Sequence, residues 1–274
     1  MQPRLKDRQR SAKRRLIAIV AGAVLIFLVS VLFILRIDSL QIQSISVRGD
    51  TVIEESQIVD SSYDVLSGNW FFVIPKSSIF LFPKNTLKTH LLETFPRFEE
   101  VSIDPLDLRS LSVVVKDKGV VALWCSKNPD KLNGIDQCYS LDEEGFVFAR
   151  GSDISGNIYK RFYGVLSGNP IGSFYASPWE FQNMRDFLSE LESLNLSPNS
   201  YEVTDNLDRI VTLASGTEIK IDSDRSFESV KSDLKTVVQE LQIKGIQIEN
   251  LLYIDLRFKD KMFYKEKQEL VTPI

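Results

Sequence analysis

A long apolar run dominates the beginning of the chain. Residues 16–35 are twenty consecutive positions without a charged side chain, and seven Lys or Arg residues precede them. A helix of this length spans a hydrocarbon core of about 30 Å, and basic residues mark the cytoplasmic side of such a helix. The pattern predicts a basic cytoplasmic tail over residues 1–15, a single transmembrane helix over residues 16–35, and an extracytoplasmic location for the rest.

A cleaved signal peptide is the alternative interpretation of this segment, because it also begins basic and continues apolar. Its apolar region usually runs for only about 7 to 15 residues and ends at a cleavage site with small residues. Here the run is longer, and Arg36, Ile37 and Asp38 follow it directly. These features favour a retained anchor.

Residues 40–124 are predicted to form a first extracytoplasmic domain. Apolar and polar positions alternate over residues 40–47 with one slip, which is typical of a strand with a bulge. Two short apolar helical faces follow, and Pro96 ends the second of these helices. Alternation then returns over residues 101–104 and 111–116. The predicted order is β-α-α-β-β.

The pattern over residues 125–265 predicts a mixed α/β domain with an antiparallel sheet, which makes the whole chain α+β. Ser177, Pro178 and Glu180 form a strong helix start. Residues 210–219 have the pattern of a hairpin, and a further helix is expected between Asp224 and Gly245. Residues 266–274 are expected to form a flexible tail.

Charge divides the chain in the same way. Residues 1–36 carry eight Lys or Arg and one Asp, so of the whole-chain charge of −4 the remaining 238 residues carry −11. Binding to phosphate backbones requires clustered Lys and Arg. The acidic exterior portion therefore argues against nucleic acid as a partner.

The two cysteines, Cys125 and Cys138, both follow the apolar run. In an oxidising exterior compartment, two cysteines that flank one short loop are first interpreted as a disulfide. Two unpaired buried thiols are the alternative. A zinc site is not expected, because the chain has one histidine and two thiolates cannot complete a set of four ligands.

Candidate catalytic groups are few. His90 is the only histidine, and no nucleophile motif accompanies it. Asp142, Glu143 and Glu144 form a carboxylate cluster, but it overlaps a turn pattern and is interpreted as a solvated loop. Phosphate-binding glycine loops are absent from the sequence. We therefore expect no enzyme activity, no cofactor, no metal and no small-molecule substrate.

Aromatic residues gather at residues 70–82, near the expected membrane end of the first domain. Trp and Phe suit a membrane interface or a docking surface, but a small domain also needs large core residues. Core packing is the favoured interpretation, with membrane contact or partner docking as the alternative.

Sequence fragments of the first domain follow one another in an order that resembles a known domain. They are Ile45-x-Val47-x-Gly49, Phe95-Pro96-x-Phe98, Val101-x-Ile103, Leu111-x-Val113-x-Val115 and Ala122-Leu123-Trp124. This set resembles the POTRA domain of the FtsQ/DivIB family of bacterial division proteins. The family usually has Glu-x-x-Pro-x-Ala before this tryptophan, whereas Asp117 begins a segment without proline here.

The second domain carries further fragments similar to the same family. They are Tyr139-x-x-Asp142-x-x-Gly145-x-Val147-Phe148, Tyr163-Gly164-x-Leu166-x-Gly168 and Tyr253-Ile254-Asp255-Leu256-Arg257-Phe258. The last is close to the family's ending strand. Within it, Asp255 and Arg257 point to the same side, and they are interpreted as a local ion pair on the surface.

The resemblance implies a non-enzymatic bitopic scaffold of the divisome in the bacterial cytoplasmic membrane, located at the division septum. It implies FtsB/DivIC-like and FtsL-like partners and control of septal peptidoglycan synthesis. The alternative is a POTRA-type envelope adaptor in protein secretion or assembly. An adaptor of that kind should lack the Tyr253 to Phe258 ending and usually precedes a barrel, of which the sequence shows no sign.

The expected partner-binding surface is the final short strand, residues 261–265, with Phe258 beside it. An edge strand leaves one row of backbone groups unpaired and is usually protected by charge. Lys261 and Lys265 flank this strand, while Met262, Phe263 and Tyr264 offer apolar contact. This composition suits an edge that accepts one extended partner segment by strand addition. A plain edge strand protected by its lysines is the alternative.

Overall fold

The structure is a computed structural model that describes residues 5–70, 73–126, 137–151, 158–166, 168–259 and 261–267. The chain divides into two compact units, Met1–Asp117 and Lys118–Ile274. The predicted boundary after Trp124 is therefore wrong. Trp124 lies on β6 (Ala122–Ser126), which pairs with β9 (Lys160–Tyr163) and β7 (Gln137–Leu141) in the sheet of the second unit.

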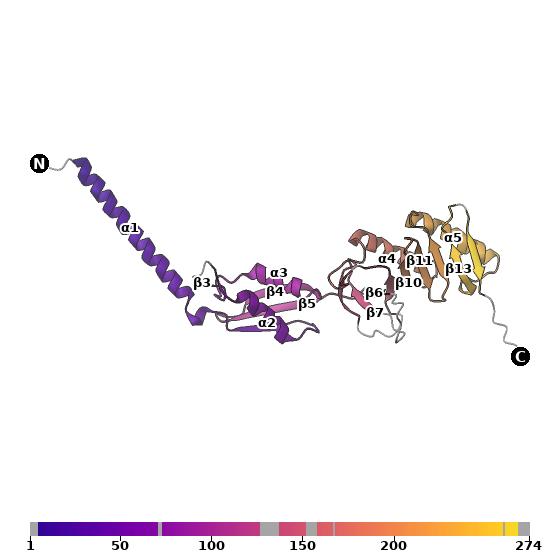
Figure 1. The fold of residues 1–274 in the computed structure, drawn as a ribbon, viewed down its shortest axis with the longest axis horizontal. Helices are drawn as coiled ribbons and strands as arrows, with labels where there is room; N and C mark the ends of the chain where they lie inside the picture. The colour runs from indigo at the N-terminus through magenta and orange to yellow at the C-terminus, as the bar shows by residue number, and fades with distance from the viewer. Residues whose placement is uncertain are drawn as a thin grey trace. The chain divides into compact units, whose positions relative to one another are not determined.

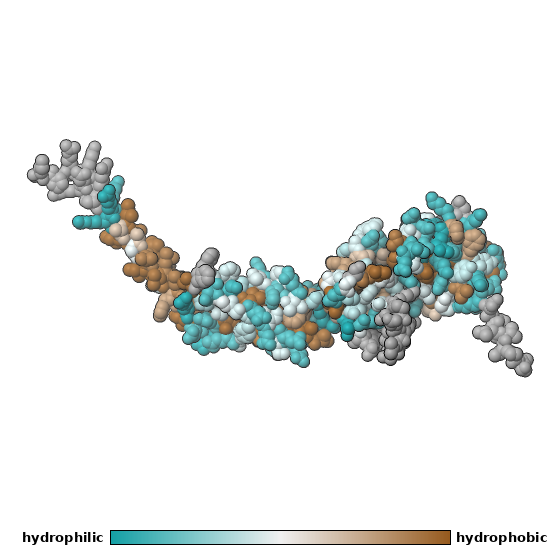
Figure 2. All heavy atoms as spheres, viewed as in Figure 1, coloured by the Kyte–Doolittle hydropathy of each residue, from teal (hydrophilic) through white to brown (hydrophobic). Residues whose placement is uncertain are grey.

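The first helix, α1 (Leu5–Leu35), contains the apolar run of the sequence. Its segment Lys13–Leu35 is long and apolar enough to cross a membrane, with a mean hydropathy of 3.1, and only Leu35 at its end is buried. Figure 2 shows mostly hydrophobic residues along this segment, after the hydrophilic ones at its beginning. No second helix of this kind occurs in the described part of the chain. The single apolar helix predicted from the sequence is thus present.

The remainder of the first unit contains a small two-stranded sheet, formed by β2 (Asn69–Trp70) and β3 (Ile74–Pro75), and a three-stranded sheet with two helices (Figure 1). The strands lie in the order β1-β5-β4, with β1 parallel and β4 antiparallel to β5. In chain order the elements are η1 (Asp38–Leu40), β1 (Ser44–Arg48), α2 (Glu55–Leu66), β2 (Asn69–Trp70), β3 (Ile74–Pro75), α3 (Lys84–Thr94), β4 (Phe98–Pro105) and β5 (Ser110–Asp117).

The core of this unit lies between the sheet and its two helices. Alternation along β4 and β5 puts Val101 and Val113 on the inner face, where both are fully buried. Ile58 of α2 and Leu87 of α3 belong to the same apolar cluster. Strand residues at every second position and helix residues at helical spacing therefore face the same core.

The second unit is built on a sheet of nine strands in the order β14-β13-β12-β11-β10-β9-β6-β7-β8. After β6, its elements are β7 (Gln137–Leu141), β8 (Val147–Arg150), β9 (Lys160–Tyr163), α4 (Pro178–Ser193), β10 (Pro198–Val203), β11 (Arg209–Leu213), β12 (Glu218–Ile221), α5 (Phe227–Ile243), η2 (Ile248–Asn250), β13 (Leu251–Asp255) and β14 (Phe263–Glu266).

The sheet is mixed, so the predicted antiparallel sheet is wrong. β9 is parallel to β10, β12 is parallel to β13, and β6 is parallel to β9. The first two pairs have a helix between their strands, α4 and α5 respectively. A helix is the usual connection between parallel neighbours, because parallel strands cannot be joined by a tight turn.

Both helices pack on this sheet through apolar faces. The α4 helix begins with the predicted capping box, in which the Ser177 hydroxyl accepts from the Glu180 amide and the Glu180 side chain accepts from the Ser177 amide. Phe181 and Leu188 of α4 and Leu234 of α5 are buried in one cluster with the strands. In α4, the capping box therefore starts the helix, and the apolar spacing gives the same helix a buried face.

Candidate partner-binding edge

The final strand, β14, forms one end of the nine-stranded sheet. It pairs antiparallel with β13, so that Ile254 faces Tyr264 and Asp255 faces Phe263 across the ladder. On its other side, no strand among the described residues pairs with it. One row of backbone groups is therefore open to a further strand.

A groove of about 520 Å³ lies beside this edge, between α5 and the connection from β13 to β14. Phe258, Lys261, Met262 and Tyr264, four of the five residues expected to bind a partner, line it. Met262 and Tyr264 are half-buried against the apolar core, whereas Lys261 is exposed. The groove thus combines an apolar floor with a charged rim.

The opposite wall of the groove comes from α5, which the sequence did not assign to the site. Val237 supplies apolar surface there, Asp233 and Glu240 supply carboxylates, and Lys244 lies 5.9 Å from the centre of the Tyr264 ring. The amphipathic spacing of α5 predicts which residues face inward. It carries no information on the strand beside which the helix lies.

The fifth expected residue, Phe263, contacts Phe258 rather than lining the groove. Their rings meet edge to face with centres 5.4 Å apart, and the two residues are 48% and 52% exposed. An exposed aromatic pair next to an open strand edge offers large contact area at a small loss of side-chain freedom on binding. The pair therefore offers an exposed apolar anchor at this end of the sheet.

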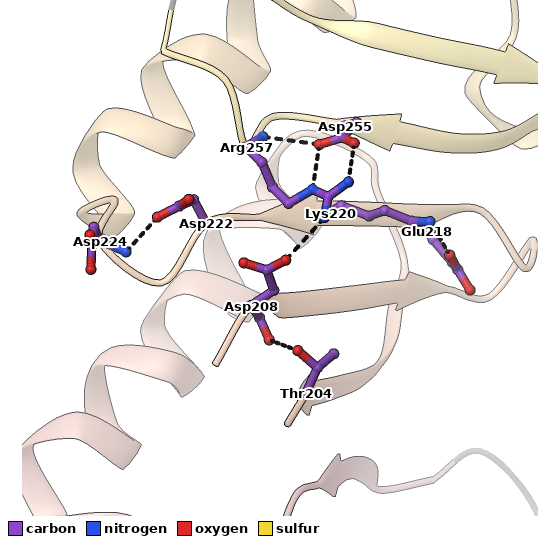
Figure 3. A network of polar contacts seen from close by, with 8 residues as sticks. All are labelled: Thr204, Asp208, Glu218, Lys220, Asp222, Asp224, Asp255 and Arg257. Carbon is purple, nitrogen blue, oxygen red and sulfur yellow. Dashed lines mark hydrogen bonds and ion pairs between the residues drawn. The ribbon is translucent and has the colours of Figure 1, made fainter. Parts of the chain in front are cut away.

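Arg257 ties the end of β13 to the start of β11 (Figure 3). Its Nε and Nη2 donate to the two carboxylate oxygens of Asp255 at 3.0 and 2.7 Å. Its Nη1 donates to Asp208 Oδ2 at 3.0 Å, across 49 residues of sequence. The side chain of Asp255 is only 9% exposed. The sequence predicted a local ion pair on the surface between Asp255 and Arg257. That prediction is wrong, because the Asp255 side chain is buried and Asp208 also accepts a hydrogen bond from Arg257.

Hydrogen bonds from Arg257 lower the pKa of the Asp255 carboxyl below its usual value, against the opposing effect of burial. The pKa of Arg257 is raised by the same hydrogen bonds. Both groups are therefore charged at neutral pH. Because Asp255 faces Phe263 in the ladder, the network fixes the strand on which the candidate edge is built.

The end of β14 is also held in place. The Lys267 amide donates to the Asn250 carbonyl at 2.8 Å, and its ammonium group donates to the carbonyls of Ser215 and Glu249, both at 2.7 Å. The predicted flexible tail over residues 266–274 is wrong for Glu266, which belongs to β14, and for Lys267. Residues 268–274 lie outside the described residues.

In the structure, Cys125 and Cys138 are joined by a disulfide. They face each other across the antiparallel pair formed by β6 and β7. The cross-link joins two neighbouring strands of the second unit, several strands away from β14 in the sheet order. It therefore belongs to the framework of the sheet rather than to the candidate edge.

The carboxylate cluster near residue 142 has a structural role. Asp142 is buried, accepts from the backbone amides of Glu144 and Phe146, and forms an ion pair with Lys118 at 2.6 Å. Its interpretation as a solvated loop is therefore wrong for Asp142. His90 lies half-buried on α3. The described residues contain no group of three or more His, Cys, Asp or Glu side chains that could hold a metal ion.

In comparisons with models of protein families and with curated proteins, nothing matches the chain.

Proposed function

We propose that the chain is a non-enzymatic, single-pass scaffold of the FtsQ/DivIB type, with its amino terminus in the cytoplasm and its two folded units outside the membrane. It binds FtsB/DivIC-like and FtsL-like proteins at the septum and helps to control septal peptidoglycan synthesis. The proposal rests on the sequence resemblance. The β-α-α-β-β arrangement of the larger elements of the first unit, and the apolar helix before it, support it.

Among the structural observations, the open edge of β14 is the one that carries the partner-binding part of the proposal. It places unpaired backbone groups, the exposed Phe258 and Phe263 pair and the groove along α5 next to one another. Strand addition needs this combination, because main-chain hydrogen bonds supply affinity and pockets for side chains supply specificity. An extended segment of an FtsB/DivIC-like protein is the proposed occupant.

The decisive experiment measures binding of that segment, as a synthetic peptide, to the full chain in detergent. Truncation of an aromatic anchor at the centre of an interface usually costs about 1–2 kcal/mol or more. We expect Phe258→Ala and Phe263→Ala each to weaken binding by about 5–30-fold. Amide exchange over residues 263–266 should slow when the parent chain binds the peptide, because an added strand would pair with the open edge.

Phe174→Ala is the matched control. Phe174 is 45% exposed and also lies in an aromatic pair, with its ring centre 5.1 Å from that of Phe146. It bridges to Phe146 near β8, at the other end of the sheet. Equal affinities for the parent, the control and the Phe258 and Phe263 variants would place the binding site elsewhere.

A fluorescent fusion of the chain in dividing cells tests the cellular part of the proposal. A band at mid-cell is expected for a divisome scaffold. An even distribution over the envelope would contradict it and would favour the envelope adaptor. The peptide experiment tests partner binding, and the fluorescent fusion tests the cellular role. A failure of one proposal is therefore distinguishable from a failure of the other.

A further inference from the structure

A group of exposed apolar side chains gathers at the end of the first unit where α1 leaves the proposed membrane. Ten large apolar residues in the described part of residues 36–117 are exposed, and seven of them fall in three short segments, residues 36–43, 69–82 and 105–110. This distribution is uneven, and it concerns segments that are far apart in the sequence. The favoured core interpretation of the aromatic stretch is wrong for Trp70 and Phe80, which are 40% and 61% exposed. Phe71 and Phe72 lie outside the described residues.

Hydrogen bonds hold the first two of these segments together. Arg36, the residue after α1, donates from Nε to the Val73 carbonyl at 3.0 Å. The Ile42 amide donates to the Ser77 carbonyl at 2.8 Å, and the Ile79 amide donates to the Leu40 carbonyl at 3.0 Å. Residues 73–81 are therefore held close to the segment that directly follows the apolar helix.

The third segment, the turn between β4 and β5, reaches the same end of the unit. Arg109 donates from Nη2 to the Ser39 hydroxyl at 3.0 Å, and its carbonyl accepts from the Gln43 amide at 2.7 Å. Ser44, at the start of β1, pairs with Ser110, at the start of β5. This pairing brings the turn before β5 close to the segment between α1 and β1. Leu106 and Leu108 of this turn are 52% and 57% exposed.

We infer that this surface, formed by Trp70, Val73, Phe80, Leu81, Leu106 and Leu108, rests in the interface of a phospholipid bilayer and holds the first unit against the membrane. The inference rests on α1 crossing the membrane and goes beyond the proposed binding of division proteins. Its occupant is a lipid surface because the covalent chain and three hydrogen-bonded segments place these side chains beside the end of the apolar helix. No partner protein is needed to bring them there.

The chemistry of the surface fits the headgroup region. Tryptophan is enriched at the level of lipid headgroups, and basic side chains extend from there toward phosphate. The Lys76 ammonium group lies 5.8 Å from the centre of the Trp70 ring. Arg36 and Arg109 flank the apolar side chains, with the carboxylates of Asp38 and Asp107 among them. Charge is thus nearly balanced, which suits a zwitterionic lipid surface.

The test uses the full chain in phosphatidylcholine vesicles, with its native disulfide formed. Leu81→Cys and Leu108→Cys variants carry an environment-sensitive fluorophore at the added thiol, and Val52→Cys is the matched control. Val52 is 70% exposed but lies beyond the other end of β1. We expect blue-shifted emission, quenched by spin-labelled lipid, at positions 81 and 108 and neither effect at position 52.

Other outcomes overturn the inference. Emission at positions 81 and 108 that matches position 52 would show that the surface stays in water. A blue shift that grows with the ratio of protein to lipid would show that a second copy of the chain covers it. Co-flotation of the chain with the vesicles reports separately that α1 has inserted. Because no division protein is present, the result is independent of the proposed partner binding.

Discussion

Asp255→Asn should destabilise the second unit, because it removes the charge from a buried carboxylate that accepts three hydrogen bonds. The donors of these bonds are the Nε, the Nη2 and the backbone amide of Arg257. Asparagine keeps one oxygen but turns an amide group toward the Arg257 guanidinium, so one bond is lost and the others lose their charge assistance. Hydrogen bonds to charged groups contribute about 1.5–3 kcal/mol each.

The side chain of Arg257 is 38% exposed, so water replaces part of what the substitution removes. We therefore expect a net loss of about 1–2 kcal/mol in the free energy of unfolding. For a unit of this size that loss corresponds to a fall in Tm of about 2–8 °C. Asp208→Asn is the matched control, since it affects a single bond to the same guanidinium and should cost less than about 1 kcal/mol.

The sign of the pH dependence follows from the lowered pKa of Asp255. A carboxyl whose pKa is lower in the folded state stabilises the fold at pH values above its unfolded pKa of about 3.9, and this contribution disappears as the pH falls through the folded pKa. The difference between the parent and Asp255→Asn should therefore be largest near pH 7 and shrink as the pH falls below about 4.

Urea unfolding of the full chain in detergent, followed by tryptophan fluorescence, measures these differences. Trp70→Phe and Trp179→Phe in all variants leave Trp124 as the remaining tryptophan of the three, and its side chain is buried in the second unit. A midpoint for Asp255→Asn equal to that of the parent at pH 7 would refute the role of the network. A loss that stays constant down to pH 3 would refute its electrostatic origin.

Three further predictions concern the framework of the chain. Replacing both Cys125 and Cys138 with Ser should lower the stability of the second unit by about 3 kcal/mol, the chain-entropy value for a closed loop of about 14 residues, measured by the urea midpoint. Gly49→Ala should cost the first unit at least about 2 kcal/mol, because Gly49 has φ +129° and an added Cβ would lie 1.9 Å from the Val115 carbonyl oxygen. Gly119→Ala, in the second unit, adds a Cβ that meets nothing within 4 Å and should change the free energy of unfolding by less than about 0.5 kcal/mol; thermal unfolding of both glycine variants measures these effects. An export-dependent reporter should be inactive when fused at residue 8 and active near the carboxyl terminus, because seven Lys or Arg precede the apolar run; the opposite result would reverse the topology.

The candidate edge was only partly readable from the sequence. A short final strand with lysines at its ends indicated an edge, and the structure does place β14 at the end of the sheet. The wall of the groove on α5 and the contact of Phe258 with Phe263 were not predicted. Both depend on which strand lies beside which helix, and neither leaves a signal in the spacing of apolar residues along one segment.

Local interactions explain what the sequence determined by itself. The charge-free run and its basic flank specify the apolar helix, because length and hydropathy are properties of a single segment. The capping box of Ser177 and Glu180 specifies the start of α4, because its hydrogen bonds span three residues. The larger elements of the first unit, β1, α2, α3, β4 and β5, followed from periods of two and of about 3.6 residues for the same reason, whereas β2 and β3 were not predicted.

The tertiary structure alone decided the features that join distant segments. The parallel pairing of β12 with β13, the bond from Arg257 to Asp208 and the burial of Asp142 each depend on partners brought together by the sheet order. The exposure of Phe80 beside the end of α1 was decided in the same way. Periodicity reports which face of a segment is buried, but the element that covers it is set by the free energy of packing the whole unit, to which residues far apart in the sequence contribute together.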